Sequence, residues 1–402
     1  MSAISHQHIL EILAGYDKDN ITIGTLGGHS GLDVCHGAKK YGFKTVAVCQ
    51  KGRDLTYSKY FKTRPDNDVV PGQLDAWKAD KGCVDDVILV EKFGDIVKPE
   101  VQEQLRAMNT IFIHNRYFWV YCDFEKIENE FLVPILGTRE MLRLEERDVP
   151  NNQYWMLEQA GIRIPKIFSY DEYLDVDNFP AEWLGRPMLV KVNEAQRKYE
   201  RAFFVVDSPA DYLDKSKVLL EEGKILEEDL KKAVIEEFVI GAHVNFNFFY
   251  SPLDGELEFM GTDMRRQTNL DGFLRMTADQ QLEMFEKGMK PKMVENGHVA
   301  VTIKESLVEK AFEIGEKFVK FTGENNSPGI IGPFALQGAV VAEDGREEIV
   351  IFDVSMRIPG SPGTRSTPYS GYLYGDSLSY GERLAMEVKR AIKEDKLPLL
   401  VT

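Results

Sequence analysis

The sequence is poor in cysteine and contains no long apolar run. Four of its 402 residues are cysteines and none forms a CxxC pair, which argues against a disulfide framework or a zinc site and favours buried thiols in a reducing cytoplasm. No apolar stretch approaches the ~20 residues that a membrane-spanning helix needs. We find no internal repeat, no low-complexity segment and no GxGxxG fingerprint, which leaves little support for a nicotinamide-binding protein.

Positive charge is also scarce. The chain has 49 Lys and Arg against 65 Asp and Glu, a formal net charge of −16, so we expect no broad nucleic-acid or anionic-membrane surface, although a local basic pocket stays open. A hydrophobic fraction of 43% is typical of a globular protein with a sizeable core, and the length predicts two or three domains. The N-terminus, MSAISHQHILEILAGYD, indicates an amphipathic helix and not a signal peptide.

Residues 20–50 predict a βαβ unit. The run ITIGTL is followed by the turn GGHSG, a helical segment that ends at Gly42, and the strand FKTVAVC. Such a unit implies a parallel sheet, and VDDVILVEKF and TIFIHNRYFWVY continue the pattern. His29 and Ser30 would then lie at the carboxyl end of a strand and before a helix, where ligands and phosphates bind. We favour a ligand role for them over a turn built for geometry alone.

A different kind of sheet is predicted after residue 170. Apolar residues alternate, with hairpin-like connections, in RPMLVKVN, RAFFVVD, AVIEEFVIG, VNFNFFYSP and ELEFMGTDMRR, which predicts antiparallel pairing. Residues 276–323 are predicted to be mostly helical, residues 331–357 to form a hairpin, and GERLAMEVKRAIKED to form a C-terminal helix. The predicted fold class is therefore α/β followed by α+β.

The predicted hairpin carries the most informative polar residues. Its first strand holds Gln337, and its second holds Asp353, followed by Ser355 and Arg357. Oxygen ligands set side by side, with an arginine beyond them, can hold Mg²⁺ against the phosphates of a nucleotide. The same residues also suit the wet face of an ordinary antiparallel hairpin, and the segment alone does not separate the two interpretations.

Two further strands suit nucleotide binding. Lys191 lies within the apolar strand MLVKV, where it can hold a phosphate as a point charge or simply protect a sheet edge. Another strand ends with Glu236, Glu237, Phe238 and Val239. Their backbone groups and carboxylates can bind an adenine edge and a ribose, or they can face solvent. The basic segment after Lys191, NEAQRKYERAFF, is either a mobile phosphate lid or a solvated turn.

A polar cluster follows ELEFMG and consists of Asp263, Arg265, Arg266 and Asn269. Paired arginines suit the recognition of phosphate or carboxylate, although a surface ion-pair network is the simpler alternative. The isolated histidines His36, His243 and His298 are not predicted to bind a ligand. His114, which precedes Asn115-Arg116-Tyr117 at a strand end, is a better site candidate.

The order of these segments resembles the ATP-grasp fold. Within that fold the chain is similar to an archaeal purine-biosynthesis family, the 5-formaminoimidazole-4-carboxamide ribonucleotide synthetases. The resembling stretches run from about residue 20 to 375: LGGHSGLDVCHGAKKYGFKTVAVC, LVPILGTREMLRLEER, AGI-x-x-PK, FYSP, DMRRQTNLDG, GPFALQ, FDVSMRI and TPYSG. The resemblance implies an N-terminal substrate-binding domain (1–135), an ATP-grasp subdomain (136–240) and a C-terminal catalytic subdomain (241–402).

The resemblance further implies an ATP-dependent carboxylate–amine ligase. The family joins formate to the 5-amino group of aminoimidazole carboxamide ribonucleotide through an acyl phosphate, and the protein mainly positions the reactants and neutralises charge. The implied cofactors are ATP and Mg²⁺, with Mn²⁺ as an alternative. The implied partners are small-molecule substrates and further copies of the chain, without nucleic acid or membrane. Aromatics expected to be exposed, such as Phe118 and Trp119, also favour a homo-oligomer.

The resemblance gives individual residues a role. His29, Ser30 and Tyr117 would contact the ribonucleotide, and Asn269 its carboxamide or base; Lys191 would hold the ATP phosphates and act with Arg357 in catalysis; Glu236, Glu237, Phe238 and Val239 would bind the adenosine; and Gln337 and Asp353 would fall at the metal positions.

This sequence departs from the family's pattern at four of these places. Gln337 and Asp353 replace two glutamates, and the loss of one carboxylate charge should weaken Mg²⁺ binding. Tyr117 replaces a small serine, AQRKYERAFF replaces a glycine-rich loop, and PGSPGT replaces an AGTN-like end. The departures suggest a diverged paralogue and leave three alternatives open. These are the formate-dependent ligase, a ligase for another carboxylate or amine, and a non-catalytic nucleotide-binding protein.

Overall fold

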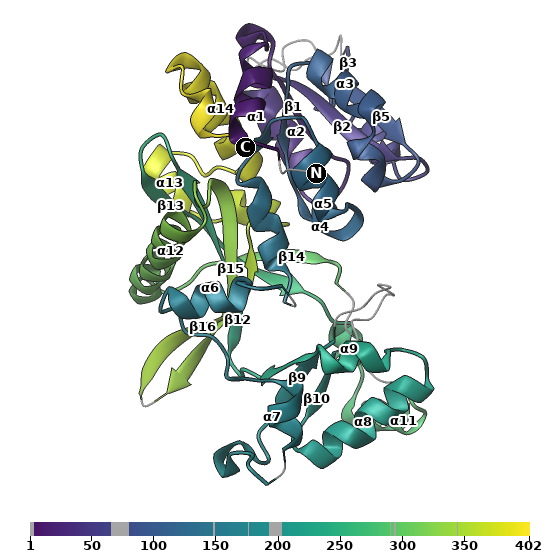
Figure 1. The fold of residues 1–402 in the computed structure, drawn as a ribbon. Coiled ribbons are helices and arrows are strands. Elements are labelled where there is room, and N and C mark those ends of the chain that lie inside the picture. The colour runs from purple at the N-terminus through teal and green to yellow at the C-terminus, as the bar shows by residue number, and fades with distance from the viewer. Residues whose placement is uncertain are drawn as a thin grey trace.

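The structure is a computed structural model that describes residues 4–65, 80–147, 149–175, 177–192, 203–289, 291–292, 295–343 and 345–402. The chain forms three bodies, each built around one of the larger sheets (Figure 1). The body that contains β12, β15 and β16 lies between the N-terminal body and the body that contains β9 and β10. The C-terminal segment, yellow in Figure 1, returns to the first body and lies beside the purple N-terminal helix.

The helices have the following bounds: α1 (His6–Ala14), α2 (Gly31–Lys40), α3 (Pro99–Ala107), α4 (Arg116–Tyr121), α5 (Phe124–Glu130), α6 (Gln153–Gln159), α7 (Tyr170–Leu174), α8 (Pro209–Glu221), α9 (Glu227–Lys231), α10 (Leu270–Phe273), α11 (Ala278–Glu286), α12 (Glu305–Asn325), α13 (Tyr369–Tyr374) and α14 (Tyr380–Lys393).

The strands have the following bounds: β1 (Thr22–Leu26), β2 (Lys44–Gln50), β3 (Arg64–Pro65), β4 (Asp80–Lys81), β5 (Asp86–Val90), β6 (Thr110–Ile113), β7 (Ile135–Leu136), β8 (Ile167–Phe168), β9 (Met188–Lys191), β10 (Phe203–Val206), β11 (Val234–Glu237), β12 (Ala242–Ser251), β13 (Glu256–Arg266), β14 (Gly297–Val301), β15 (Gly332–Glu343) and β16 (Arg346–Ser355).

The first body is a parallel sheet of order β5-β2-β1-β6-β7. Thr22 of β1 pairs with Lys44 of β2 on one side and with Thr110 of β6 on the other, and α2 connects β1 to β2. Every residue of β1 is buried, as expected for the centre of a parallel sheet. The predicted βαβ unit is confirmed, and Gly42 follows α2 in the left-handed region (φ +83°) that favours glycine at a helix end.

The second and third sheets are antiparallel, as predicted. Their orders are β10-β9-β11-β8 and β14-β13-β12-β15-β16. Helices α6 and α12 cover one face of the third sheet, where Phe246 and Phe248 of β12 join their core. Successive strand residues point to opposite faces, so Asn245 and Asn247 belong to the other, polar face. This polar face turns toward the first body.

Residues 276–323 are mostly helical, as expected, because α11 and α12 lie there, but they also include the strand β14, which pairs with β13. The strand in TIFIHNRYFWVY ends at Ile113, next to His114 as expected, and Asn115 then accepts the N–H of Tyr117 (2.9 Å) and caps α4. Phe118 is fully buried and Trp119 is half-buried, so neither forms the exposed aromatic surface that favoured an oligomer.

The cysteines agree with the expectation of buried, unpaired thiols. Cys35, Cys49 and Cys83 are buried, Cys122 is half-buried, and all four are free thiols. Burial raises the pKa of Cys49 to about 12 and that of Cys83 to about 11, which keeps both protonated and unreactive. Within the ranges given above, no helix combines the length and the apolar composition that crossing a membrane requires.

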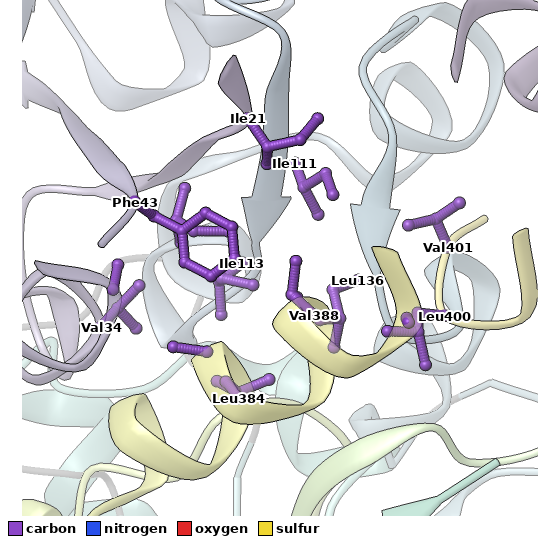
Figure 2. Packing of buried hydrophobic residues seen from close by; sticks show 14 of the residues in the cluster. Ile21, Val34, Phe43, Ile111, Ile113, Leu136, Leu384, Val388, Leu400 and Val401 are labelled. Carbon is purple, nitrogen blue, oxygen red and sulfur yellow. The ribbon is translucent and has the colours of Figure 1, made fainter. Parts of the chain in front are cut away.

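A shared core joins the C-terminal segment to the parallel sheet. Figure 2 shows side chains of both parts packed together, among them Ile111, Ile113, Leu136, Leu384, Val388, Leu400 and Val401. The end of the chain also pairs with β7, where Ile135 and Thr402 exchange both backbone N–H···O bonds (3.0 and 2.9 Å). Each buried aliphatic side chain contributes about 1.5–3 kcal/mol, so this core stabilises the first body substantially.

Helices α2 and α14 cross at a pair of glycines. A Cβ on Gly37 would lie 1.9 Å from the carbonyl carbon of Gly381, and a Cβ on Gly381 would lie 1.9 Å from the carbonyl oxygen of Asp33. Asp33 also accepts the backbone N–H of Gly381 through its side chain (2.9 Å). The two helices therefore approach so closely that only glycine fits at the crossing.

We expect Gly37→Ala to lower the free energy of unfolding by roughly 1–3 kcal/mol, the range for overpacking. In an unobstructed helix the same exchange raises stability by up to about 1 kcal/mol, because alanine is the better helix former. Gly323→Ala in α12 is the matched control, since a Cβ there meets nothing within 4 Å. Chemical denaturation measures both; a Gly37→Ala variant as stable as the parent protein would contradict the close contact.

Candidate active site

A cavity lies between the first body and the polar face of the third sheet. It is lined by His29, Arg116, Asn245, Asn247, Asp263, Arg265, His298, Ala335, Gln337, Ser355, Arg357, Pro359, Gly360 and Ser361. Its volume is about 20 Å³, enough for about one water molecule. A larger ligand therefore enters only when the side chains or the two walls move apart.

The glycine-rich turn after β1 forms the wall that the first body contributes. A Cβ on Gly28 would lie 1.9 Å from the ring of Tyr117, so any larger residue here would displace that ring. The Asn115 side-chain amide donates to the carbonyl oxygens of Leu26 (3.0 Å) and Gly28 (3.1 Å). These contacts close the turn and place His29 at the carboxyl end of β1, the edge at which parallel sheets bind ligands.

His29 and Ser30 have different surroundings. The ring of His29 packs on Gly360, where a Cβ would come within 2.1 Å of it. Burial, followed by the nearby guanidinium groups of Arg357 and Arg116, lowers the pKa of His29 to about 2, so its imidazole is neutral. Ser30 is buried and donates its hydroxyl to the carbonyl oxygen of Pro359 (2.5 Å). Ser30 thus ties the two walls together, whereas His29 lines the cavity.

Three arginines make the cavity positive. Arg265 of β13 donates to Oε1 of Gln337 (2.8 Å), and Arg116 and Arg357 approach from the ends of α4 and β16. The Nε groups of Arg265 and Arg357 are buried and have no hydrogen-bond partner within the described part of the chain. Glu295 lies 3.9 Å from both Arg116 and Arg265, too far for a hydrogen bond. A phosphate or carboxylate would satisfy these donors.

A buried carboxylate that the sequence analysis missed holds Arg357. Glu145 ends the short helical segment Arg139–Glu145, and its Oε2 lies 3.4 Å from Nη2 of Arg357. Its Oε1 accepts the backbone N–H of Met356 (2.6 Å). Burial raises the pKa of Glu145 to about 7, although Arg357 opposes the shift. Nothing in the local sequence LRLEER distinguishes this acid from the one that follows it.

His298, which the sequence left isolated, belongs to the cavity through Asp263. Its Nδ1 hydrogen-bonds the Asp263 carboxylate, which also accepts from the amides of Asn245 (2.8 Å) and Asn247 (2.7 Å). Burial raises the pKa of Asp263, but the hydrogen bonds from His298 and Asn247 outweigh it and hold the pKa below its ordinary value. The contact depends on β14, the strand that the sequence analysis missed.

The predicted cluster after ELEFMG is only partly in the cavity. Asp263 and Arg265 line it, whereas Arg266 forms an ion pair with Asp271 that is half exposed. Asn269 is exposed, and its side chain accepts the backbone N–H of Lys292 (2.7 Å). The alternation along β13 explains the split between Arg265 and Arg266.

The two predicted metal ligands lie side by side, but an arginine holds each of them. Gln337 pairs with Asp353 across the hairpin. Its Oε1 accepts from Arg265, while Oδ1 of Asp353 accepts from Arg147 (2.9 Å). One amide and one carboxylate, both bound to cations, do not fit a divalent metal, which needs free oxygen ligands. Among the residues described, no three His, Cys, Asp or Glu side chains come together as a metal site.

Lys191 and Glu236 form a buried ion pair beside this hairpin. Nζ of Lys191 lies 2.5 Å from Glu236 and donates to the hydroxyl oxygen of Tyr154 (2.8 Å), whose own proton goes to Glu236 (2.5 Å). Lys191 and Glu236 are 5% and 3% exposed. Lysine is rarely buried to this extent unless it is paired, and Glu236 is its partner. Burial lowers the pKa of Lys191, although Glu236 opposes the shift. Tyr154 and Arg147 are additions that the sequence analysis missed.

The other predicted adenosine residues continue from this ion pair. The backbone N–H groups of Glu237 and Phe238 donate to the carbonyl oxygens of Lys166 (2.8 Å) and Pro187 (3.0 Å). Phe238 is 38% exposed, whereas Val239 is buried. The predicted phosphate lid, NEAQRKYERAFF, lies outside the described residues except for its last two positions.

Tyr117 does not line the cavity. Its ring covers Gly28, and its hydroxyl accepts a hydrogen bond from Arg53 (3.0 Å). The Arg53 guanidinium also lies 5.4 Å from the ring centres of Phe93, Tyr117 and Tyr121. In this arrangement the Tyr117 ring packs against the glycine-rich turn and does not face the cavity.

Two family models match the chain. "Protein of unknown function (DUF1246)" matches residues 23–168, and "Domain of unknown function (DUF1297)" matches residues 211–402. Together they include the glycine-rich turn and the polar face of the third sheet, but neither description names an activity.

The chain is similar over its full length to curated proteins of one name, 5-formaminoimidazole-4-carboxamide-1-(beta)-D-ribofuranosyl 5'-monophosphate synthetase. The protein from Methanocaldococcus jannaschii is 38% identical over 404 residues, which cover 99% of this chain and 100% of that protein. The protein from Methanothermobacter thermautotrophicus is 36% identical over 405 residues, which cover 100% of both.

Solved structures agree with this similarity. The IMP biosynthesis protein PurP from Thermococcus kodakaraensis superimposes with a TM-score of 0.64 at 26% identity, covering 94% of this chain and 100% of that one. An ADP complex of purK, an N5-carboxyaminoimidazole ribonucleotide synthetase, gives a TM-score of 0.55 at 15% identity, covering 90% of this chain and 78% of that one. At this identity the second likeness shows the fold alone.

Glu145 generates a prediction about stability and pH. Its pKa is about 7 in the folded chain against an ordinary 4.5, so the folded state binds the proton more tightly than the unfolded state. The stabilising effect of this proton is complete below the unfolded pKa and is lost as the pH rises through the folded pKa. At about 1.36 kcal/mol per pKa unit the loss is on the order of 3 kcal/mol.

Glu145→Gln removes this titration and keeps an acceptor for the Met356 N–H. We therefore expect the variant to gain up to about 3 kcal/mol on the parent protein when the pH rises from about 4.5 to about 8. Denaturant titrations of both proteins at the two pH values measure the gain. An unchanged difference between them would show that Glu145 does not titrate in this range.

Proposed function

Because the chain belongs to the 5-formaminoimidazole-4-carboxamide ribonucleotide synthetase family, we propose that it joins formate to the 5-amino group of aminoimidazole carboxamide ribonucleotide. It has the ATP-grasp fold and is an ATP-dependent ligase that forms a carbon–nitrogen bond in purine biosynthesis. The products are the formamido ribonucleotide, ADP and phosphate. The cavity with three arginines is the observation that carries this proposal.

The charge of the cavity suits these reactants. The ribonucleotide brings a phosphate and formate brings a carboxylate, and Arg116, Arg265 and Arg357 offer guanidinium donors to both. Two of these arginines have buried Nε groups without a partner in the described ranges, and an anion would supply it. His29 is neutral and adds a hydrogen-bonding group at the sheet edge, where the ribonucleotide would lie.

The hairpin connects this cavity to the predicted ATP site. Asp353, Ser355 and Arg357 alternate, so their side chains lie along one face of the strand and its continuation. Asp353 adjoins the cluster of Lys191 and Glu236, whereas Ser355 and Arg357 line the cavity. ATP bound at the cluster would direct its γ-phosphate along this face toward the cavity.

The reaction would proceed in two steps. Formate attacks the γ-phosphate of ATP and yields formyl phosphate and ADP, and the 5-amino group then displaces phosphate from the formyl carbon. The arginines hold the anions together and offset the negative charge that accumulates in each step. Lys191 exchanges Glu236 for an ATP phosphate when ATP binds, because both acceptors compete for the same ammonium group.

The ligase uses ATP together with a divalent cation. We propose Mg²⁺, with Mn²⁺ as an alternative, carried by the ATP phosphates. The described arrangement of Gln337 and Asp353 does not fit that cation, because Arg265 and Arg147 hold both side chains. The expected self-association of the chain stays a prediction.

Phosphate release tests the proposed function. The purified protein should release phosphate from ATP and Mg²⁺ only when formate and aminoimidazole carboxamide ribonucleotide are both present, and each omission should stop it. Release that requires the ribonucleotide but a different acid would indicate a diverged ligase. Binding of ATP without any release, detected as a thermal shift, would favour the non-catalytic alternative and contradict the proposal.

Arg357→Gln should lower kcat/KM by about 10²–10³-fold, the range for losing one charge-stabilising donor. Its matched control is Arg163→Gln, because Arg163 forms a half-exposed ion pair with Glu343 (2.8 Å), and neither residue lines the cavity. Exposed pairs of this kind contribute about 0–1 kcal/mol to stability, so the control should keep its activity. Equal activities of the two variants would exclude Arg357 from the reaction.

A further inference from the structure

A histidine and a carboxylate form a dyad in the wall of the cavity. His298 lies on β14 beside Arg265 of β13, and Asp263 lies two residues earlier on the same strand. The carboxylate can only accept, so the Nδ1 of His298 donates the proton in their hydrogen bond. In a neutral imidazole this leaves Nε2 unprotonated and able to accept a proton.

Hydrogen bonds from two asparagines fix the orientation of the Asp263 carboxylate. It is fully buried, and the amides of Asn245 and Asn247 donate to its two oxygens at 2.8 and 2.7 Å. Burying a charge is costly unless hydrogen bonds stabilise it, and these two amides already supply donors from the neighbouring strand. The imidazole is a third donor at the cavity side. Asp263 therefore sets both the tautomer and the ring orientation of His298.

His298 differs from the other histidine of the cavity. His29 has no carboxylate partner in the described part of the chain, and burial together with Arg357 and Arg116 lowers its pKa to about 2. His298 lines the cavity with 14% of its side chain exposed, next to Arg265 and opposite the glycine-rich turn that carries His29. Of these two rings, His298 is the one that a carboxylate orients, as in a catalytic triad.

We propose that His298 is the general base of the second chemical step and that Asp263 is its positioning residue; this inference rests on the proposed function. The lone pair of the 5-amino nitrogen forms the bond to the formyl carbon, and the bond from that carbon to the phosphate oxygen breaks with its electron pair. One N–H proton of the attacking amine moves to Nε2 of His298. The imidazolium then gives this proton to the departing phosphate or to water.

Rapid-quench single-turnover experiments separate the two chemical steps. With all substrates bound, His298→Asn should form ADP at a rate close to that of the parent protein, because formyl phosphate formation needs no proton from the amine. The formamido ribonucleotide should form about 10²–10⁴-fold more slowly, the usual contribution of a general base. Asparagine keeps a donor for Asp263, so the buried carboxylate stays partnered.

Two controls accompany this experiment. His8→Asn replaces an exposed histidine of α1 and should leave both steps unchanged. A thermal melt of each variant shows whether it folds. If His298→Asn does not fold, His298→Gln takes its place. Normal formation of the formamido ribonucleotide in either His298 variant would overturn the proposal, as would an equal slowing of ADP formation. A parent protein that makes no formamido ribonucleotide would instead overturn the proposed function.

Discussion

The geometry of the cavity depends on how α14 is clamped between the first body and the third sheet. On one side it meets α2 at Gly37 and Gly381, where a side chain on either would strike backbone atoms. On the other side Arg383, 2% exposed, donates two bonds to Glu258 (2.8 and 2.5 Å) and one to Glu387 (2.8 Å). Separating the partners of a buried bidentate ion pair strongly destabilises the protein, because each buried charge then lacks its partner. Through these contacts α14 connects the two parts of the chain that form the walls of the cavity.

The charge of the cavity is opposite in sign to the net charge of the chain. The protein carries a net charge of −16, yet three arginines converge on the cavity. The buried carboxylates around them have distinct environments: Glu145 supports Arg357, and Asp263 supports His298. Beside the hairpin, Lys191 forms an ion pair with Glu236, and Arg147 forms one with Asp353. These two acids are the ones predicted to lie at the ATP and metal positions.

The sequence predicted the framework because the framework follows local patterns. The βαβ unit, the antiparallel strands and the hairpin with Gln337 beside Asp353 all have the periodicity that their structures require. The partners of the candidate residues could not be predicted in this way. Glu145 reaches Arg357 across more than two hundred positions of the chain, and His298 meets Asp263 only because β14 joins the sheet edge. Such contacts depend on tertiary packing, which a single sequence does not display.

Mass spectrometry of the product tests the account most directly. The protein would be incubated with ATP, Mg²⁺, aminoimidazole carboxamide ribonucleotide and formate labelled at its carbon. The ribonucleotide should gain one formyl group that carries the label, in proportion to the ADP formed. ADP formation without a labelled nucleotide, or a nucleotide that remains unmodified while ATP is bound, would contradict it.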